Sequence, residues 1–166
     1  MVQQAMLSPK VFQLLLVLIL IAILISVALT RLQSYQAGLE PLKVDEVTDQ
    51  LQQGATRLKA EYWLQHNAAG LVVFNKANPI ALLAEAPENY LGELRADETA
   101  KVKAGYWYFD LDRQLLVYRL KYPQYFAGQP AEISYQLSFS FADSNNDGKF
   151  DPAADKALGL ELVVKP

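Results

Sequence analysis

Cysteine is absent from this 166-residue chain, and histidine occurs once, at His66. The absence of cysteine excludes a disulfide framework, a thiolate nucleophile and a cysteine-ligated metal. The sequence also has no Gly-x-Ser-x-Gly elbow and no glycine-rich phosphate loop. His66 is expected to cap the last carbonyls of a helix. We therefore predict that the protein is not an enzyme, with no catalytic residues and no organic cofactor.

Basic residues are fewer than acidic ones, and all 18 acidic residues follow Thr30. Lys10 is the only basic residue before that point, so residues 31–166 carry a net charge of −4, one lower than the −3 of the whole chain. This negative charge argues against nucleic acid as a partner. It also argues against an anionic lipid surface as a second ligand.

Charge is missing altogether from Val11–Leu29, where Gln13 and Ser26 are the only polar side chains. A helix of this length measures about 28 Å, close to the hydrocarbon thickness of a bilayer. The pattern predicts a transmembrane helix over residues 11–30. A cleaved signal peptide, with Ser26 and Ala28 before its cleavage site, is the alternative.

The apolar segment divides the chain into a tail, residues 1–10, a membrane span and a further domain, residues 31–166. Basic residues flank both ends of the span, so the orientation is predicted from the short tail, which stays in the cytoplasm. In a bacterium this makes the chain a single-pass inner-membrane protein with residues 31–166 in the periplasm.

The helix is expected to continue to about residue 66, with a kink near Gly38 and Pro41. Beyond Pro41 apolar residues recur every three or four positions, which predicts an amphipathic helix. The stripe consists of Val44, Val47, Leu51, Ala55, Leu58 and Tyr62. An apolar stripe of this kind needs a covering partner, which the rest of the chain must supply.

Residues 67–104 are predicted to form an irregular connecting region. A short strand is expected at Leu71–Phe74 and a short helix at Pro79–Glu85, since proline suits the first turn of a helix. The charged stretch Arg95–Lys103 is interpreted as a loop, preceded by Tyr90 and Leu94 turned inward.

Residues 105–166 have an apolar period of two, which is typical of strands. Strands are predicted at Tyr106–Leu111, Leu115–Tyr122 and Glu132–Phe141, and from Leu158 to Val164. Their short connections favour a four-stranded antiparallel sheet with one apolar face, which the helix over residues 31–66 is long enough to cover. The predicted fold class is therefore α+β.

The aromatic residues around Trp107 are interpreted as core and shielded edge, with a sugar- or partner-contacting patch as the alternative. Trp63 is expected to pack between helix and sheet.

Two segments carry a resemblance to a known family. Asn78–Leu94, and Gly105–Asp110 followed by Leu116–Leu120, are similar to the MSHA (mannose-sensitive haemagglutinin) pilus biogenesis proteins, particularly their F-type component. The chain as a whole resembles a type IV pilin-like protein, with a long helix, half hydrophobic and half amphipathic, on an antiparallel sheet. The resemblance implies an accessory or minor subunit of the pilus. Its partners would be other pilin-like subunits and pilus assembly proteins, contacted through the transmembrane helix.

The N-terminal segment departs from that family. Its prepilins have a glycine at the cleavage site, then phenylalanine or methionine, and a glutamate at the fifth mature position. Phe12 would take the first mature position here, but Val11 stands in place of the glycine and Leu16 in place of the glutamate. We therefore expect an uncleaved subunit that is retained in the inner membrane.

Residues 143–155 contain the one motif with recognisable chemistry. Side-chain oxygens fall at positions 1, 3, 5 and 9, with glycine at position 6, the pattern of a calcium-binding loop. Calcium prefers several hard oxygen ligands, and alternate residues of a tight loop point inward to supply them. The predicted ligands are Asp143, Asn145, Asp147, the carbonyl of Lys149, Asp151 and Asp155.

The motif departs from an EF-hand at position 12, where Ala154 replaces the usual glutamate. Asp155 is expected to close the ligand shell instead, and Phe150 to anchor the loop in the core. The alternative is a polar turn, since Asn, Asp and Gly are common turn residues. Four carboxylates within thirteen residues would repel one another without a cation, which favours calcium.

A second function is left open by these patterns. The chain would then be a membrane-anchored periplasmic calcium-binding or sensor domain with no role in a pilus.

Overall fold

The computed structural model describes residues 9–126 and 131–165. The chain divides into two compact units, Met1–Leu39 and Glu40–Pro166, each considered by itself below. Of the predicted tail, only Pro9 and Lys10 are among the described residues. The second unit contains helices and a sheet, so the α+β class is confirmed.

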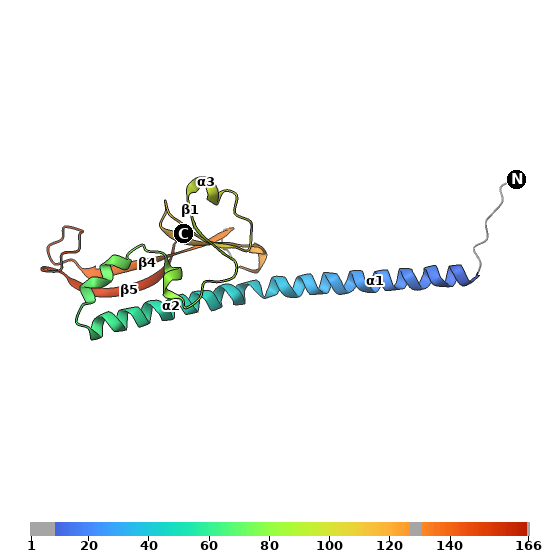
Figure 1. The fold of residues 1–166 in the computed structure, drawn as a ribbon, viewed down its shortest axis with the longest axis horizontal. Helices are drawn as coiled ribbons and strands as arrows, with labels where there is room; N and C mark the ends of the chain where they lie inside the picture. Colours follow the sequence, from blue (N-terminus) through green and yellow to red (C-terminus); the bar gives the residue numbers. More distant parts are fainter. Residues whose placement is uncertain (1–8, 127–130, 166) are drawn as a thin grey trace. The chain divides into compact units, whose positions relative to one another are not determined.

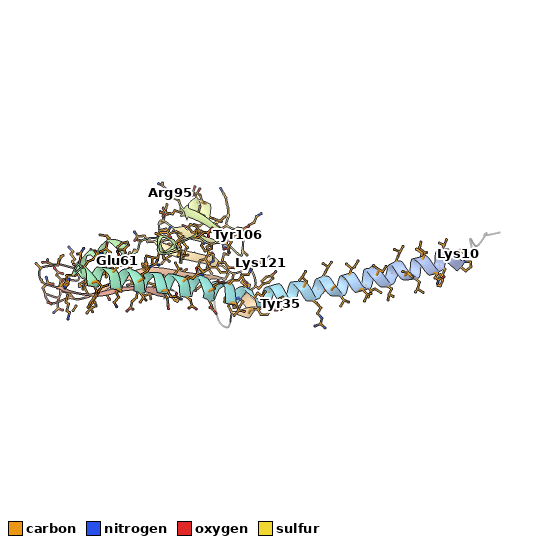
Figure 2. All side chains as sticks on the ribbon, turned by 60° about the horizontal axis from the view of Figure 1, so that its bottom comes forward. Lys10, Tyr35, Glu61, Arg95, Tyr106 and Lys121 are labelled. Carbon is orange, nitrogen blue, oxygen red and sulfur yellow. The ribbon has the colours of Figure 1, made fainter. Side chains whose placement is uncertain are left out.

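The first unit contains helix α1, Pro9–Gly38. Its segment Pro9–Leu32, 24 residues with a mean hydropathy of 3.1, is long and apolar enough to cross a membrane, and none of its most apolar stretch is buried. A signal sequence meets the same criterion. Side chains stand out along α1 from Lys10 onward (Figure 2). Near the end of the apolar segment, the Thr30 hydroxyl donates a hydrogen bond to the Ser26 carbonyl at 2.9 Å. This polar hydroxyl therefore has a hydrogen-bond partner within the helix itself.

Helix α2, Glu40–Leu64, begins directly after Leu39, the single non-helical residue that follows α1. The interruption lies where Gly38 and Pro41 predict it. Pro41 falls in the first turn of α2, where a backbone N–H would have no partner within the helix. Proline therefore starts this helix without cost.

The end of α2 is set by the backbone of His66, which has a φ of 56°. The His66 amide donates to the Trp63 carbonyl (3.0 Å), and the Asn67 amide donates to the Tyr62 carbonyl (2.9 Å). These two bonds form a Schellman motif. The helix thus stops close to the predicted residue 66, by means of a left-handed residue.

The connecting region differs from the prediction in detail. Leu71–Phe74 is not a strand but part of the 3₁₀ helix η1, Ala68–Phe74. Within this apolar run Leu71 is fully buried and Phe74 packs partly buried against Tyr62, whereas Val73 is 70% exposed. The predicted helix from Pro79 is the shorter 3₁₀ helix η2, Pro79–Leu82. The predicted loop 95–103 contains one helical turn, α3, Ala96–Thr99.

The sheet has five strands in the order β1-β2-β3-β4-β5, so the prediction of four antiparallel strands is wrong. The added strand, β1 (Tyr90–Leu94), pairs in parallel with β2. A parallel pair needs a crossover connection, and the segment that contains α3 provides it. The prediction missed this strand because a pattern of apolar residues does not reveal a parallel pairing. The remaining strands pair antiparallel. They are β2 (Trp107–Asp110), β3 (Leu115–Arg119), β4 (Glu132–Ala142) and β5 (Lys156–Lys165), with the 3₁₀ helix η3 (Pro123–Tyr125) after β3.

A bulge changes the predicted alternation of β5. Ser140 pairs with Gly159, but Phe141 pairs with Ala157, so Leu158 is an extra residue. Leu158 is accordingly 47% exposed, whereas Leu160 is buried. An inserted residue of this kind shifts every side chain beyond it to the opposite face.

Helix α2 covers one face of the sheet, lying along β4 and β5 in Figure 1. Val44 and Leu51 pack in one apolar cluster, and Ala55 belongs to a second one nearer the end of the helix. The members of these clusters include Trp107, Phe109, Leu116, Tyr118, Ile133, Tyr135, Leu137, Phe139 and Leu160. The sheet therefore supplies the partner that the amphipathic stripe requires.

The aromatic residues of β2 lie in the core. Trp107 and Phe109 face α2, and Tyr108 packs on the other side of the sheet. All three are at most 5% exposed, which confirms the interpretation as core, while the preceding Tyr106 is 37% exposed. Trp63 is 48% exposed, so the prediction that it packs between helix and sheet is wrong.

Glu40 joins the start of α2 to the end of the third strand. Its carboxylate is buried and accepts hydrogen bonds from the Tyr118 hydroxyl (2.9 Å) and the amides of Lys121 and Tyr122 (2.7 Å each). Because the carboxylate takes these two amides, they leave the sheet ladder. This explains why β3 ends at Arg119 and not at the predicted Tyr122.

We expect Gly54→Ala to destabilise the protein. The new Cβ would lie 2.9 Å from Leu82 Cβ and 3.0 Å from the Leu82 carbonyl oxygen. A gain of about 1 kcal/mol in helix propensity is outweighed by about 1–3 kcal/mol of overpacking. The measurement is denaturant unfolding of the full chain in detergent micelles. Gly38→Ala is the matched control, because nothing lies within 4 Å of its Cβ position; a stabilised Gly54→Ala protein would contradict the close approach of η2 to α2.

Alkaline pH should weaken the fold. Burial raises the pKa of Tyr118 well above the ordinary value of 10.0, and the hydrogen bond to Glu40 raises it further. Burial also raises the pKa of Tyr90, Tyr108 and Tyr135. Since the folded-state pKa values exceed the unfolded ones, this stability is fully present below pH 10.0 and is lost as pH rises through the folded-state values.

The expected result is a free energy of unfolding that declines above pH 10.0, and less steeply in Tyr118→Phe, which cannot ionise. Tyr125→Phe, at a residue 46% exposed, should keep the wild-type slope. Equal slopes in all three proteins would show that Tyr118 does not contribute.

Candidate calcium-binding loop between β4 and β5

The loop over residues 143–155 joins the end of β4 at Ala142 to the start of β5 at Lys156. All six predicted ligand residues lie in it, and all are described. Two of its residues adopt left-handed backbone conformations, Asn146 with a φ of 59° and Gly148 with a φ of 74°. Glycine adopts this conformation without strain, so position 6 of the motif is a sharp bend, as the sequence predicts.

The first half of the loop is folded around its own polar side chains. Asp143 Oδ2 accepts from the Gly148 amide at 2.8 Å, which joins position 1 to position 6. Asn145 Oδ1 accepts from the Asp147 amide at 3.1 Å, and Asp147 Oδ1 accepts from the Lys149 amide at 2.8 Å. The side chains at positions 1, 3 and 5 therefore turn into the loop rather than away from it.

Asp155 holds the two halves of the loop together. Its Oδ1 accepts from the Ser144 amide and its Oδ2 from the Asp151 amide, both at 2.9 Å. The Asp155 amide in turn donates to the Asp151 carbonyl at 2.8 Å. The residue after position 12 thus closes the loop, although these bonds are to the backbone and not to a metal.

One oxygen in the loop has no protein partner. Asp143 Oδ1 is buried and makes no hydrogen bond, the only such side-chain atom among the described residues. A buried carboxylate oxygen without a partner is costly. A cation beside it would supply the missing interaction, so this one oxygen is a candidate ligand.

The remaining carboxylates are not gathered around that oxygen. Within the described ranges, no three Asp, Glu or His side chains lie close enough to share a metal ion. Asp147 and Asp151 point their oxygens at nearby amides, the latter accepting from the Ala153 amide at 2.9 Å. Ion binding would therefore have to exchange some of these amide bonds for coordination, whereas the polar-turn alternative needs no such exchange.

Phe150 connects the loop to the core. Its ring makes edge contacts with Phe139 and Phe141 of β4, with centroid separations of 4.9 and 5.3 Å. Such aromatic pairs stabilise a fold beyond the area they bury. The loop is thereby attached to the apolar cluster beneath α2, as predicted for position 8.

Sequence reasoning missed Glu40, which has the most extensive polar contacts of any buried side chain described here. Its only sequence signal is an acidic residue before proline at a helix start, which ordinarily indicates an exposed first turn.

A search against protein-family models, curated proteins and solved structures finds no match to this chain.

Proposed function

We propose that this chain is a non-enzymatic, single-pass, pilin-like accessory or minor subunit of an MSHA-type type IV pilus biogenesis system. It would stay uncleaved in the bacterial inner membrane, with its N-terminus in the cytoplasm and its C-terminal domain in the periplasm. The proposal rests on the family resemblance of the sequence together with the architecture of each unit.

The observation that carries the proposal is the unburied apolar segment Pro9–Leu32. A helix of this hydropathy with every side exposed requires lipid or other apolar helices around it. The chain then continues into a helix whose single apolar stripe is covered by a sheet. A membrane helix that leads into a helix-on-sheet domain is the arrangement expected of a pilin-like subunit.

Gln13 and Ser26 are the polar groups within the membrane segment available for contacts with neighbouring helices. In lipid, helices associate by close packing and polar contacts, since burial in a partner gains nothing over burial in lipid tails. The family's glutamate at the fifth mature position is absent, because Leu16 occupies that place. The subunit would therefore join other pilin-like helices without the charge contact that family members use.

Photo-cross-linking from the membrane segment tests the pilus role. A benzoylphenylalanine at Leu18, which is 53% exposed, should give cross-links to pilin-like subunits in native membranes. The same probe at Gln53 in α2 is the control and should not yield those products. Cross-links to no pilus protein, with the chain equally abundant in cells lacking pili, would favour the alternative of a membrane-anchored periplasmic calcium-binding or sensor domain.

The retained N-terminus can be checked on the same preparation. The intact mass of the native protein should include residues 1–11. A mature N-terminus at Phe12, or removal of the segment near Ala28, would contradict an uncleaved subunit.

We further propose that residues 143–155 bind calcium, which would neutralise their carboxylates and stiffen the connection between β4 and β5. The ligands would be Asp143, Asn145, Asp147, the Lys149 carbonyl, Asp151 and Asp155. The buried, unpartnered Asp143 Oδ1 supports this assignment. Calcium would act here as a structural ion and not as a catalyst.

Calcium titration of the full chain should give a saturable heat and an increase in thermal stability. A ligand at a hundred times its Kd stabilises by about 2.7 kcal/mol through mass action. Asp143→Asn should abolish the heat, whereas Asp49→Asn, on an exposed position of α2, should leave it unchanged. No heat at millimolar calcium would mean that the loop is a polar turn.

A further inference from the structure

A cavity of about 530 Å³ lies beside the edge strand β1, apart from the loop discussed above. Its apolar lining consists of Leu91 and Leu94 of β1 together with Val102 and Tyr106. Leu94 and Val102 pack against Tyr108, on the sheet face that α2 does not cover. Leu91 is 46% exposed and Tyr106 37% exposed, so apolar surface is open to an occupant.

The walls of the cavity are fixed by hydrogen bonds. The Arg119 guanidinium donates to the Val102 carbonyl and is held by an ion pair with Glu132 at 2.7 Å. The Arg119 amide donates to the Tyr106 carbonyl at 3.1 Å, and the Leu111 amide donates to the Leu94 carbonyl at 3.0 Å. A preformed site of this kind costs little to organise when a ligand binds.

The rim of the cavity is basic. Lys101 and Lys103 flank the buried Val102, and both are exposed. Neither ammonium group makes an ion pair among the residues that the structure describes. The third charged rim residue, Glu98, accepts from the Arg95 amide at 3.1 Å as part of a capping box and keeps its negative charge. Two lysines against one glutamate give the rim a net charge of +1, on a chain with net negative charge.

The position of β1 favours an extended occupant. β1 pairs only with β2, so it is an edge of the sheet in the described part of the chain. Nothing lies within 4 Å of the Cβ position at Gly92, in the middle of β1. Extended peptides bind at open sheet edges and place alternate side chains in neighbouring pockets.

We propose that this cavity docks an extended segment of a partner protein that carries an apolar side chain next to one or two carboxylates. The apolar side chain fills the space between Leu91 and Tyr106. The carboxylates pair with Lys101 and Lys103. The docking site is independent of the pilus role and of the calcium loop.

Selection from a random linear peptide library tests the proposal, with the full chain held in zwitterionic nanodiscs. Peptides that combine an apolar residue with neighbouring Asp or Glu should be enriched over bare nanodiscs. Their affinity, measured by fluorescence polarisation, should fall at least about tenfold in the Lys101→Glu/Lys103→Glu variant, because like charges then face each other. Leu91→Ser should weaken the same peptides through loss of the apolar contact.

The matched control is Lys76→Glu/Lys156→Glu, which reverses two exposed lysines elsewhere in the same unit and should bind as the wild type does. Circular dichroism of each variant confirms that it is folded. Either of two results would overturn the proposal. One is no enrichment of acidic–apolar peptides, and the other is equal binding of the enriched peptides to wild type and to the Lys101→Glu/Lys103→Glu variant.

Discussion

The contact between the apolar stripe of α2 and one face of the sheet is the interaction on which the second unit depends. Val44, Leu51 and Ala55 are almost fully buried there, against Trp107 and Leu116 among others. Full burial of a Val or Leu side chain is worth about 1.5–3 kcal/mol. Without this contact the sheet would expose an aromatic face and the helix an apolar stripe, and neither layer would be stable alone.

Polar contacts fix where that layered contact begins and how it is aligned. Glu40 is buried at the first residue of α2 and accepts hydrogen bonds from the Lys121 and Tyr122 amides, which follow the end of β3. Gly54, further along, lets η2 pack against the helix more closely than any side chain would allow. These contacts differ in kind from the apolar stripe, since they specify position more than they add driving force.

The candidate functional features lie around this rigid centre. The loop over residues 143–155 is attached to it by Phe150, and the lysine-rimmed cavity is built on the opposite side of the sheet. Both are attached to ordered strands, although ion binding would exchange amide hydrogen bonds within the loop for coordination. The proposed roles in ion binding and partner docking would be consistent with the proposed pilus subunit.

The sequence alone determined the features that depend on local periodicity. The uncharged run at 11–29, the stripe from Val44 to Tyr62 and the alternation in 132–141 were sufficient for the α1 segment, α2 and β4. The turn chemistry of residues 143–155 likewise located the loop. Only the tertiary structure decided what depends on pairing between distant residues. Such features are the parallel strand β1, the bulge at Leu158, the burial of Glu40 and the cavity beside Lys101. Their stabilising partners lie far away in the chain, so no local pattern of residues encodes them.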